Sequence, residues 1–265
     1  MAIFQEGIRI SMLVIVNIIL YLYIFVIGIV VGSFLNVVIY RVPLVISVAK
    51  GRSFCPRCQA PIKGYHNVPV FSYFWLRGKC ADCGEPIAIR YPLVELFTGI
   101  MAILIFAVYG FSFQWLVVFV AGAILICITM IDFDTMIIPN GLVIALMVPA
   151  LLSFFFFPEV GILSRVIGIF VISLPMLILT LFIPDAFGGG DIKLMAVAGF
   201  MLGWGNTLLA TFIGLLLGGA VAVVLLAKKT KDKHMPFGPY LCIGIMTALL
   251  FGDIIIKWYL NLFGL

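Results

Sequence analysis

The stretch Ile124-Leu-Ile-Cys-Ile-Thr-Met-Ile131-Asp132 is an apolar run that ends in a carboxylate. A second carboxylate, Asp191, follows three glycines in Phe187-Gly-Gly-Gly-Asp191-Ile-Lys193 and opens another apolar run. An ionisable group at the edge of hydrocarbon is costly, so it indicates a functional site by default. Two carboxylates brought together there could share a proton and activate water. The two stretches therefore predict a membrane fold and the centre of its chemistry.

The composition extends this interpretation to the whole chain. Hydrophobic residues make up 65% and charged residues 10% of it, against about 45–50% and 25% in soluble domains. A spanning helix needs about 20 apolar residues. We therefore expect an all-α polytopic membrane protein with about eight transmembrane helices. The predicted spans are 11–40, 93–109, 113–131, 138–157, 161–183, 192–204, 207–227 and 239–261. The first apolar run lacks a small-residue cleavage site, so it is expected to be a retained span.

The cations predict the orientation, because cytoplasmic segments carry an excess of Lys and Arg. With both termini outside, all but three of the 16 Lys and Arg residues fall inside. The three exceptions are Arg9, Arg165 and Lys257. The inside set is Arg41, Lys50, Arg52, Arg57, Lys63, Arg77, Lys79, Arg90, Lys193, Lys228, Lys229, Lys231 and Lys233. This arrangement predicts that Asp132 and Asp191 share the cytoplasmic side of the membrane.

The net charge of +5 needs no nucleic acid partner. Most of it is positive-inside charge, which also suits the lipid bilayer and its anionic inner leaflet.

A polar segment at 42–92 separates the first two spans. It contains Cys55-Pro-Arg-Cys58 and Cys80-Ala-Asp-Cys83, and this pairing of Cys-x-x-Cys motifs is typical of a four-thiolate zinc site. Four protein ligands leave no open position for water, so we expect a structural zinc knuckle rather than a catalytic metal. Free thiols are the alternative, because cytoplasmic placement argues against disulfides. Gly64 and Gly84 are expected to serve the knuckle turns.

Each carboxylate also has a plainer interpretation. Asp132 and Asp134 precede Pro139-Asn140 and could form only a polar turn between two spans. Asp132 is favoured over Asp134 for catalysis because it continues the buried run. Gly188-Gly189-Gly190 could be a flexible loop, but glycines beside an acid at the membrane surface also permit close approach of a substrate backbone. Lys193 could pair with a lipid phosphate or with Asp191.

Five motifs together resemble the type IV prepilin peptidases of bacteria, which are membrane aspartic proteases with a GxGD signature. That signature corresponds to Gly188-x-Gly190-Asp191 here, and the similarity runs from about residue 28 to 245. The other four motifs are Gly32-Ser-Phe-Leu-Asn36-Val-Val-Ile-Tyr-Arg41-Val-Pro43, the paired Cys-x-x-Cys, Arg90-Tyr91-Pro92-Leu-Val-Glu95-Leu-Phe-Thr98-Gly99 and Pro236-Phe-Gly-Pro239.

The resemblance implies cleavage of the basic leader of type IV prepilins or pseudopilins at the cytoplasmic face. It also implies methylation of the new N-terminal amine from S-adenosylmethionine. The family's catalytic aspartates correspond to Asp132 and Asp191. The residues expected to support the substrate or the active site are Gly188, Gly190, Lys193, Asn36, Arg41, Arg90 and Glu95. Four of them, Asn36, Arg41, Arg90 and Glu95, are associated with the methylation function.

The implied division of the chain is a first transmembrane helix at 1–41, a methyltransferase-associated zinc loop at 42–92 and a seven-helix peptidase at 93–265. Cysteines 55, 58, 80 and 83 are the expected zinc ligands.

Two other functions fit parts of the sequence. A transporter or scaffold could use the zinc knuckle as a docking loop, although the halves show no internal repeat. An intramembrane protease of the presenilin type shares Gly-x-Gly-Asp but would place both acids deeper within its spans and would not need the zinc loop. Cleavage of a prepilin, but not of an unrelated transmembrane segment, would distinguish a prepilin peptidase from both alternatives.

Overall fold

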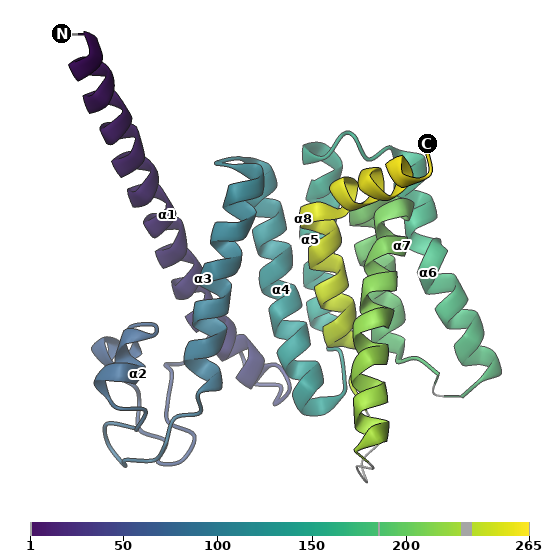
Figure 1. The fold of residues 1–265 in the computed structure, drawn as a ribbon. Coiled ribbons are helices and arrows are strands. Elements are labelled where there is room, and N and C mark those ends of the chain that lie inside the picture. Colours follow the sequence, from purple (N-terminus) through teal and green to yellow (C-terminus); the bar gives the residue numbers. More distant parts are fainter. Residues whose placement is uncertain (1, 185, 229–234, 265) are drawn as a thin grey trace. The chain divides into compact units, whose positions relative to one another are not determined.

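The computed structural model describes residues 2–184, 186–228 and 235–264, and every regular element within them is a helix. Lys229, Lys231 and Lys233 lie outside these residues, and so does the side chain of Arg9. The all-α fold class is therefore confirmed. The helices are α1 (Ala2–Arg41), η1 (Gly64–Asn67), α2 (Phe71–Trp75), α3 (Arg90–Tyr109), α4 (Phe113–Thr135), α5 (Asn140–Phe156), α6 (Ile162–Phe182), α7 (Gly189–Ala227) and α8 (Gly238–Leu262) (Figure 1).

Among the described residues, six helices are long and apolar enough to cross a membrane: α1, α3, α4, α6, α7 and α8. The apolar helix α5 has 17 residues and is shorter. The 39-residue helix α7 contains a break at Gly203, whose φ of 74° and ψ of 169° are not helical. This break falls at the end of the predicted 192–204 span, where glycine permits a backbone conformation that other residues avoid. The count of eight spans stays a prediction.

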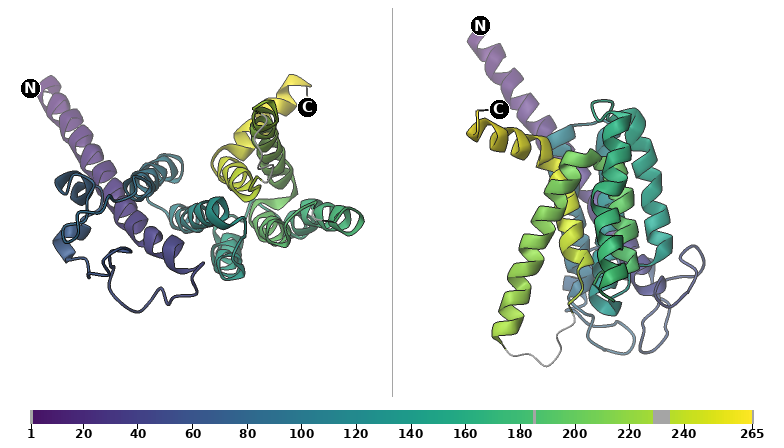
Figure 2. Two further views of the ribbon diagram at one scale, coloured as in Figure 1. Left: turned by 90° about the horizontal axis from the view of Figure 1, so that it is seen from below. Right: turned by 90° about the vertical axis from the view of Figure 1, so that its right-hand side faces the viewer.

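The chain forms two compact units, which can be followed in Figures 1 and 2. The first unit comprises Met1–Val38 and Ser47–Gly110. Within it, α1 and α3 meet through small residues: a Cβ added to Gly28 would lie 2.6 Å from the Gly99 Cα. A Cβ added to Gly32 would lie 2.7 Å from the Glu95 Cα. Small residues let membrane helices approach closely and gain packing contacts.

The second unit comprises Ile39–Ile46 and Phe111–Leu265, and therefore contains α4 to α8. One close helix crossing joins α6 to α7, where a Cβ added to Gly168 would clash with the Gly199 carbonyl and a Cβ on Gly199 would clash with the Gly168 carbonyl. A second crossing places Gly244 of α8 against the Ala210 carbonyl of α7. The glycines of this unit thus act as packing surfaces that hold α7 between its neighbours.

Arg165 is fully buried at the start of α6 rather than a solvated loop cation. Its guanidinium donates to the carbonyls of Ser153, Phe157 and Val160 at 2.9, 2.8 and 3.0 Å. It also donates to the Phe200 carbonyl at 3.1 Å, close to the break at Gly203. Arginine carries several donors in a rigid plane and no acceptor, so it can satisfy helix-end carbonyls from several elements at once. Arg165 ties α5, α6 and α7 together.

The α6–α7 crossing generates a stability prediction. Gly199→Ala adds a methyl group against the Gly168 carbonyl, and overpacking of this kind typically costs about 1–3 kcal/mol. Gly219→Ala, in the same helix, adds a methyl group with no atom within 4 Å. We expect a lower thermal unfolding midpoint in detergent for Gly199→Ala and an unchanged or higher one for Gly219→Ala. Equal midpoints for the two variants would contradict this packing.

Candidate active site and metal centre

Asp132 occupies a position that a carboxylate normally avoids. It lies in the last turn of α4, where the helix dipole is unfavourable for negative charge, and it is only 4% exposed. The α4 helix ends just beyond it, with Met136 in the left-handed conformation and its amide bonded to the Asp132 carbonyl. Compensation comes from another helix, because the Gly238 amide donates to Asp132 Oδ2 at 3.0 Å. Gly238 is the first residue of α8, so the positive end of that helix faces the carboxylate.

Asp191 lies in the first turn of its own helix, α7, where the dipole favours an acid. It is 8% exposed, and the Gly188 backbone amide lies against its carboxylate. Its Oδ1 atom is buried and accepts no hydrogen bond from the described residues. An unpaired buried carboxylate oxygen is unusual in native proteins and needs an explanation such as a catalytic role.

Ile138 packs against the backbone beside each of the two carboxylates. This buried residue lies in the link between α4 and α5. A Cβ added to Gly190 would lie 2.7 Å from the Ile138 Cβ, and one added to Gly238 would lie 3.1 Å from its Cδ1. The side chain of Ile138 therefore packs between the glycine beside Asp191 and the glycine that binds Asp132. Nearby, Phe187 and Phe237 contact each other, with ring centroids 5.9 Å apart.

The two aspartates are close enough to interact electrostatically. Cys242, buried in α8, lies within electrostatic reach of both. The rival acid Asp134 lies two residues further along the last turn of α4 and is exposed. Of the two acids weighed at the end of α4, the structure therefore buries Asp132 and brings it to Asp191.

The support residues predicted from sequence fall into two groups. Gly188, Gly190 and Lys193 lie beside Asp191 in the second unit. Lys193 is exposed, and its Nζ donates to Asn140 Oδ1 at 2.9 Å. The hydrogen bond is therefore made to an amide and not to Asp191, one of the two partners weighed for Lys193, and the lipid phosphate stays a prediction. Arg41 is buried at the end of α1 and also belongs to the second unit.

Asn36, Arg90 and Glu95 belong to the first unit. Asn36 is buried in α1 and donates to the Tyr91 carbonyl at 3.0 Å. Glu95 is buried in α3, where its Oε2 accepts from the Val70 amide of the loop at 2.7 Å. These hydrogen bonds tie α1 to α3 and the loop to α3.

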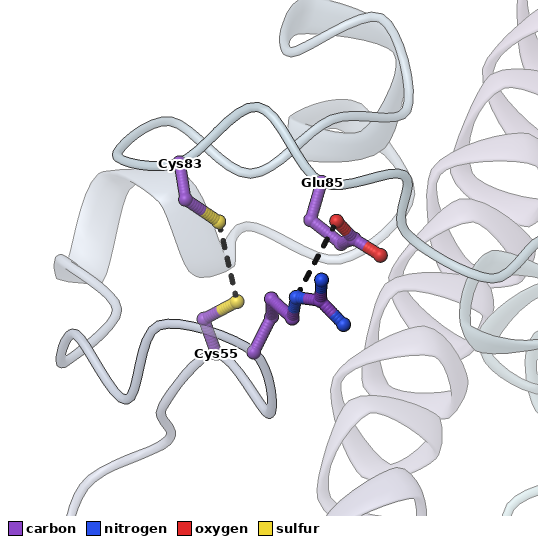
Figure 3. Close-up of polar contacts among 4 residues, drawn as sticks. Cys55, Cys83 and Glu85 are labelled. Atoms are coloured by element: carbon purple, nitrogen blue, oxygen red, sulfur yellow. Dashed lines mark hydrogen bonds and ion pairs between the residues drawn. The ribbon is translucent and has the colours of Figure 1, made fainter.

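The four loop cysteines form a cluster whose ligand atoms all lie within 4.8 Å of one another. Tetrahedral zinc with Zn–S bonds of about 2.3 Å requires sulfur atoms about 3.8 Å apart. The Sγ atoms of Cys55 and Cys83 are 3.9 Å apart (Figure 3). Backbone amides of Cys58 and Arg57 lower the pKa of the Cys55 thiol to about 7, which favours the thiolate that binds metal. The Glu85 amide lowers the pKa of Cys83 in the same way, but burial and the three neighbouring thiols outweigh it and raise that pKa to about 12. The donor set and its spacing fit a structural zinc ion.

The two halves of this metal centre repeat one backbone pattern. In each half the amide of the first cysteine donates to the carbonyl five residues later, and the turn residue takes a positive φ. The matching pairs are Cys55 N–H to Ala60 O with Gln59 at φ 61°, and Cys80 N–H to Glu85 O with Gly84 at φ 72°. Gly84 therefore serves its turn as predicted. Gly64 does not, because it begins η1 and Gln59 takes the equivalent turn position.

An ion pair also crosses between the halves, with Arg57 Nε 4.0 Å from Glu85 Oε2 (Figure 3). Both side chains are largely exposed, so this pair contributes little to stability.

Sequence reasoning missed two residues of the aspartate site. Gly238 was quoted only as part of Pro236-Phe-Gly-Pro239, and its amide proves to be the hydrogen-bond donor to Asp132. A glycine between a phenylalanine and a proline at the start of a span was the available signal. Ile138 gave no signal, because an isoleucine among isoleucines looks like ordinary core.

Comparison with known proteins gives consistent matches to each unit. The profile of the bacterial peptidase A24 N-terminal domain matches residues 26–109. The profile of the type IV leader peptidase family matches residues 118–223, which include both aspartates. The chain is 33% identical to the prepilin leader peptidase/N-methyltransferase of Aeromonas hydrophila, with 91% of this chain and 93% of the relative covered. This chain belongs to the type IV leader peptidase family.

Relatives of the same name from other bacteria agree with this membership. The Neisseria gonorrhoeae protein is 34% identical over 89% of this chain and 93% of its own length. The Legionella pneumophila protein is 31% identical over 91% and 95%. No solved structure was found to match the chain. A multi-pass protein of the inner membrane is therefore shown by the family together with the apolar helices.

The cysteine cluster predicts the effect of removing its ligands. Cys55→Ser and Cys80→Ser each remove one thiolate from opposite halves, so both variants should lose the zinc that the purified wild type retains. Cys127→Ala, in the buried part of α4, should keep it. Zinc bound per chain, measured by elemental mass spectrometry, checks this. Equal zinc in all four proteins, or none in the wild type, would contradict a four-thiolate site.

Proposed function

We propose that this chain removes the leader peptide of type IV prepilins or pseudopilins and then methylates the new N-terminal amine. The observation that carries the proteolytic part is the placement of two buried aspartates at helix ends in one unit, within electrostatic reach of each other. Family membership and the names of the relatives support the same activity. The catalytic assignment of Asp132 and Asp191 is part of this proposal.

The chemistry follows from two carboxyl groups that share a proton. The ionised member takes a proton from a water molecule as that water attacks the scissile carbonyl carbon. The protonated member hydrogen-bonds the carbonyl oxygen as negative charge develops there. The carboxyl group that took the proton from water then donates it to the peptide nitrogen as the C–N bond breaks, which releases the new N-terminal amine. The Gly238 amide holds Asp132 by one oxygen, and Asp191 Oδ1 has no partner among the described residues. That free oxygen suits a role in contacting water or substrate.

The site also suits the substrate class that the relatives' names indicate. A prepilin carries a charged leader followed by an apolar helix, so its scissile bond lies at the membrane interface. We propose that both termini of the enzyme lie outside and that the loop and aspartates face the cytoplasm. Asp132 and Asp191 lie at opposite chain-wise ends of α4 and α7, so antiparallel spans bring them to one membrane surface. The leader is then cut without carrying its charge through lipid.

Methylation is proposed from the relatives' names, with S-adenosylmethionine as the donor that supplies the methyl group. The family resemblance associates this function with Asn36, Arg41, Arg90 and Glu95. The hydrogen bonds described for Asn36 and Glu95 are made to the chain's own backbone. They give these two residues a structural role, so the donor's binding residues are left unassigned.

The decisive test of the aspartates is prepilin cleavage in membranes. Asp132→Asn and Asp191→Asn each remove one member of a catalytic unit, and such changes typically lower kcat by roughly 10³-fold or more. Asp134→Asn, an exposed neighbour, is the matched control and should cleave normally. N-terminal mass spectrometry of the pilin reads cleavage and methylation together. Normal cleavage by either Asp132→Asn or Asp191→Asn would overturn the assignment.

Gly238 gives a second, subtler test. A Cβ at this position would lie 2.6 Å from Asp132 Oδ2 and would push the carboxylate aside. Misplacement of a catalytic group by about 1 Å can cost about 10²-fold in rate. We therefore expect Gly238→Ala to cleave prepilin about 100-fold more slowly while retaining the wild-type amount of folded protein. Gly219→Ala controls for adding a methyl group to a glycine in a helix, and equal rates for both variants would refute the role of Gly238.

A further inference from the structure

The short loop helix α2 exposes its largest apolar side chains. Phe71, Phe74 and Trp75 are 70%, 72% and 86% exposed, whereas Ser72 and Tyr73 are half-buried. Positions 71, 74 and 75 lie on one side of a helix, because residues three and four apart are neighbours. We call these three residues the aromatic face. A loop surrounded by water would normally turn such a face inward, so this arrangement indicates an apolar partner.

A hydrogen bond ties the start of α2 to a membrane-spanning helix and so sets the level of the aromatic face along that helix. The Val70 amide, immediately before α2, donates to Glu95 Oε2 at 2.7 Å. Glu95 is the sixth residue of the spanning helix α3, about 8 Å along its axis from Arg90. The start of α2 is therefore tied to the first turns of a membrane helix. In Figure 1, α2 is level with the lower parts of α1 and α3.

The backbone at Val70 has a strained conformation, which sets the direction in which α2 leaves the preceding loop. Val70 has φ 63° and ψ −52°, and the Phe71 amide donates to the Pro69 carbonyl at 2.6 Å across it. This is the rare form of the three-residue γ-turn, and a β-branched residue there is an outlier. Such conformations persist only where surrounding contacts enforce them. The Glu95 carboxylate supplies that contact and so sets the direction in which the aromatic face points.

The surroundings of α2 are cationic. Residues 42–92 hold seven Lys and Arg residues but only two carboxylates, Asp82 and Glu85. Arg77 and Lys79 follow α2 directly and are exposed. Lys63 lies 6.0 Å from the centre of the Tyr65 ring, and Tyr65 is also exposed. Aromatic rings beside cations are typical of segments that lie in the headgroup layer, where the cations meet lipid phosphates.

We infer that α2 is an interfacial membrane anchor. Its aromatic face inserts at the boundary between headgroups and acyl chains of the bilayer that α1 and α3 cross, and Arg77 and Lys79 contact anionic headgroups. Because the two Cys-x-x-Cys motifs flank α2 along the chain, this anchor holds the zinc knuckles against the membrane surface. The inference depends on the first unit alone and not on the peptidase chemistry.

The test places a single tryptophan in the aromatic face. Trp115, Trp204 and Trp258 are replaced by Phe, so that Trp75 is the only tryptophan and can be excited selectively at the red edge of its absorption. The full chain is reconstituted in phosphatidylglycerol and phosphatidylethanolamine vesicles. Lipids brominated near the headgroup or deep in the acyl chain quench tryptophan at matching depths, and acrylamide quenches it from water. We expect strong quenching by shallow bromines, weaker quenching by deep bromines and poor access for acrylamide.

The matched control carries Ala81→Trp and Trp75→Phe in the same background, which moves the fluorophore to an exposed knuckle position. This tryptophan should be quenched by acrylamide and not by brominated lipid. The inference is overturned if Trp75 behaves like the control. It is also overturned if Trp75 becomes protected from acrylamide only when prepilin is added, since the aromatic face would then be a substrate surface.

Discussion

Burying two carboxylates in an apolar helix bundle is the constraint on which the second unit depends. Each is accommodated by the positive end of a helix: Asp191 by its own helix α7, and Asp132 by α8 through the Gly238 amide. Both arrangements also involve tight packing, because Ile138 fills the space beside Gly190 and Gly238. The link between α4 and α5 therefore determines where two distant parts of the chain meet. Arg165 makes a second tie within this unit, because it donates to carbonyls at the end of α5 and to the Phe200 carbonyl near the break in α7.

The first unit solves a different problem with similar means. Its loop is rich in cations and poor in aliphatic core, and it is held by its attachments to α3 and by a cysteine cluster that suits a structural zinc ion. Glu95 provides one attachment by accepting the Val70 amide, and Asn36 joins α1 to α3 through the Tyr91 carbonyl. Buried polar groups in membrane helices are normally satisfied in this way. The metal centre, the strained turn and the aromatic face thus form one continuous segment whose position depends on α3.

Much of this organisation was predictable from the sequence, because membrane helices require long apolar runs and zinc knuckles require paired Cys-x-x-Cys motifs. The helical fold was confirmed, and Asp132 proved buried where Asp134 is exposed. Contacts between distant segments were not predictable: the Gly238 amide, the Ile138 contact and the Arg165 hydrogen bonds depend on tertiary packing. The prediction that Gly64 serves a knuckle turn was wrong, because Gln59 takes the positive φ at that turn. The catalytic roles stay a proposal.

The most direct test of the central claim asks whether positions 132 and 191 face each other in the native membrane. Asp132→Cys and Asp191→Cys are combined in a chain in which Cys127 and Cys242 are Ala, and a short bifunctional methanethiosulfonate is applied. Our account predicts a cross-linked peptide pair containing residues 132 and 191, and little product when Asp134→Cys replaces Asp132→Cys. A cross-link between 134 and 191, with none between 132 and 191, would contradict the account.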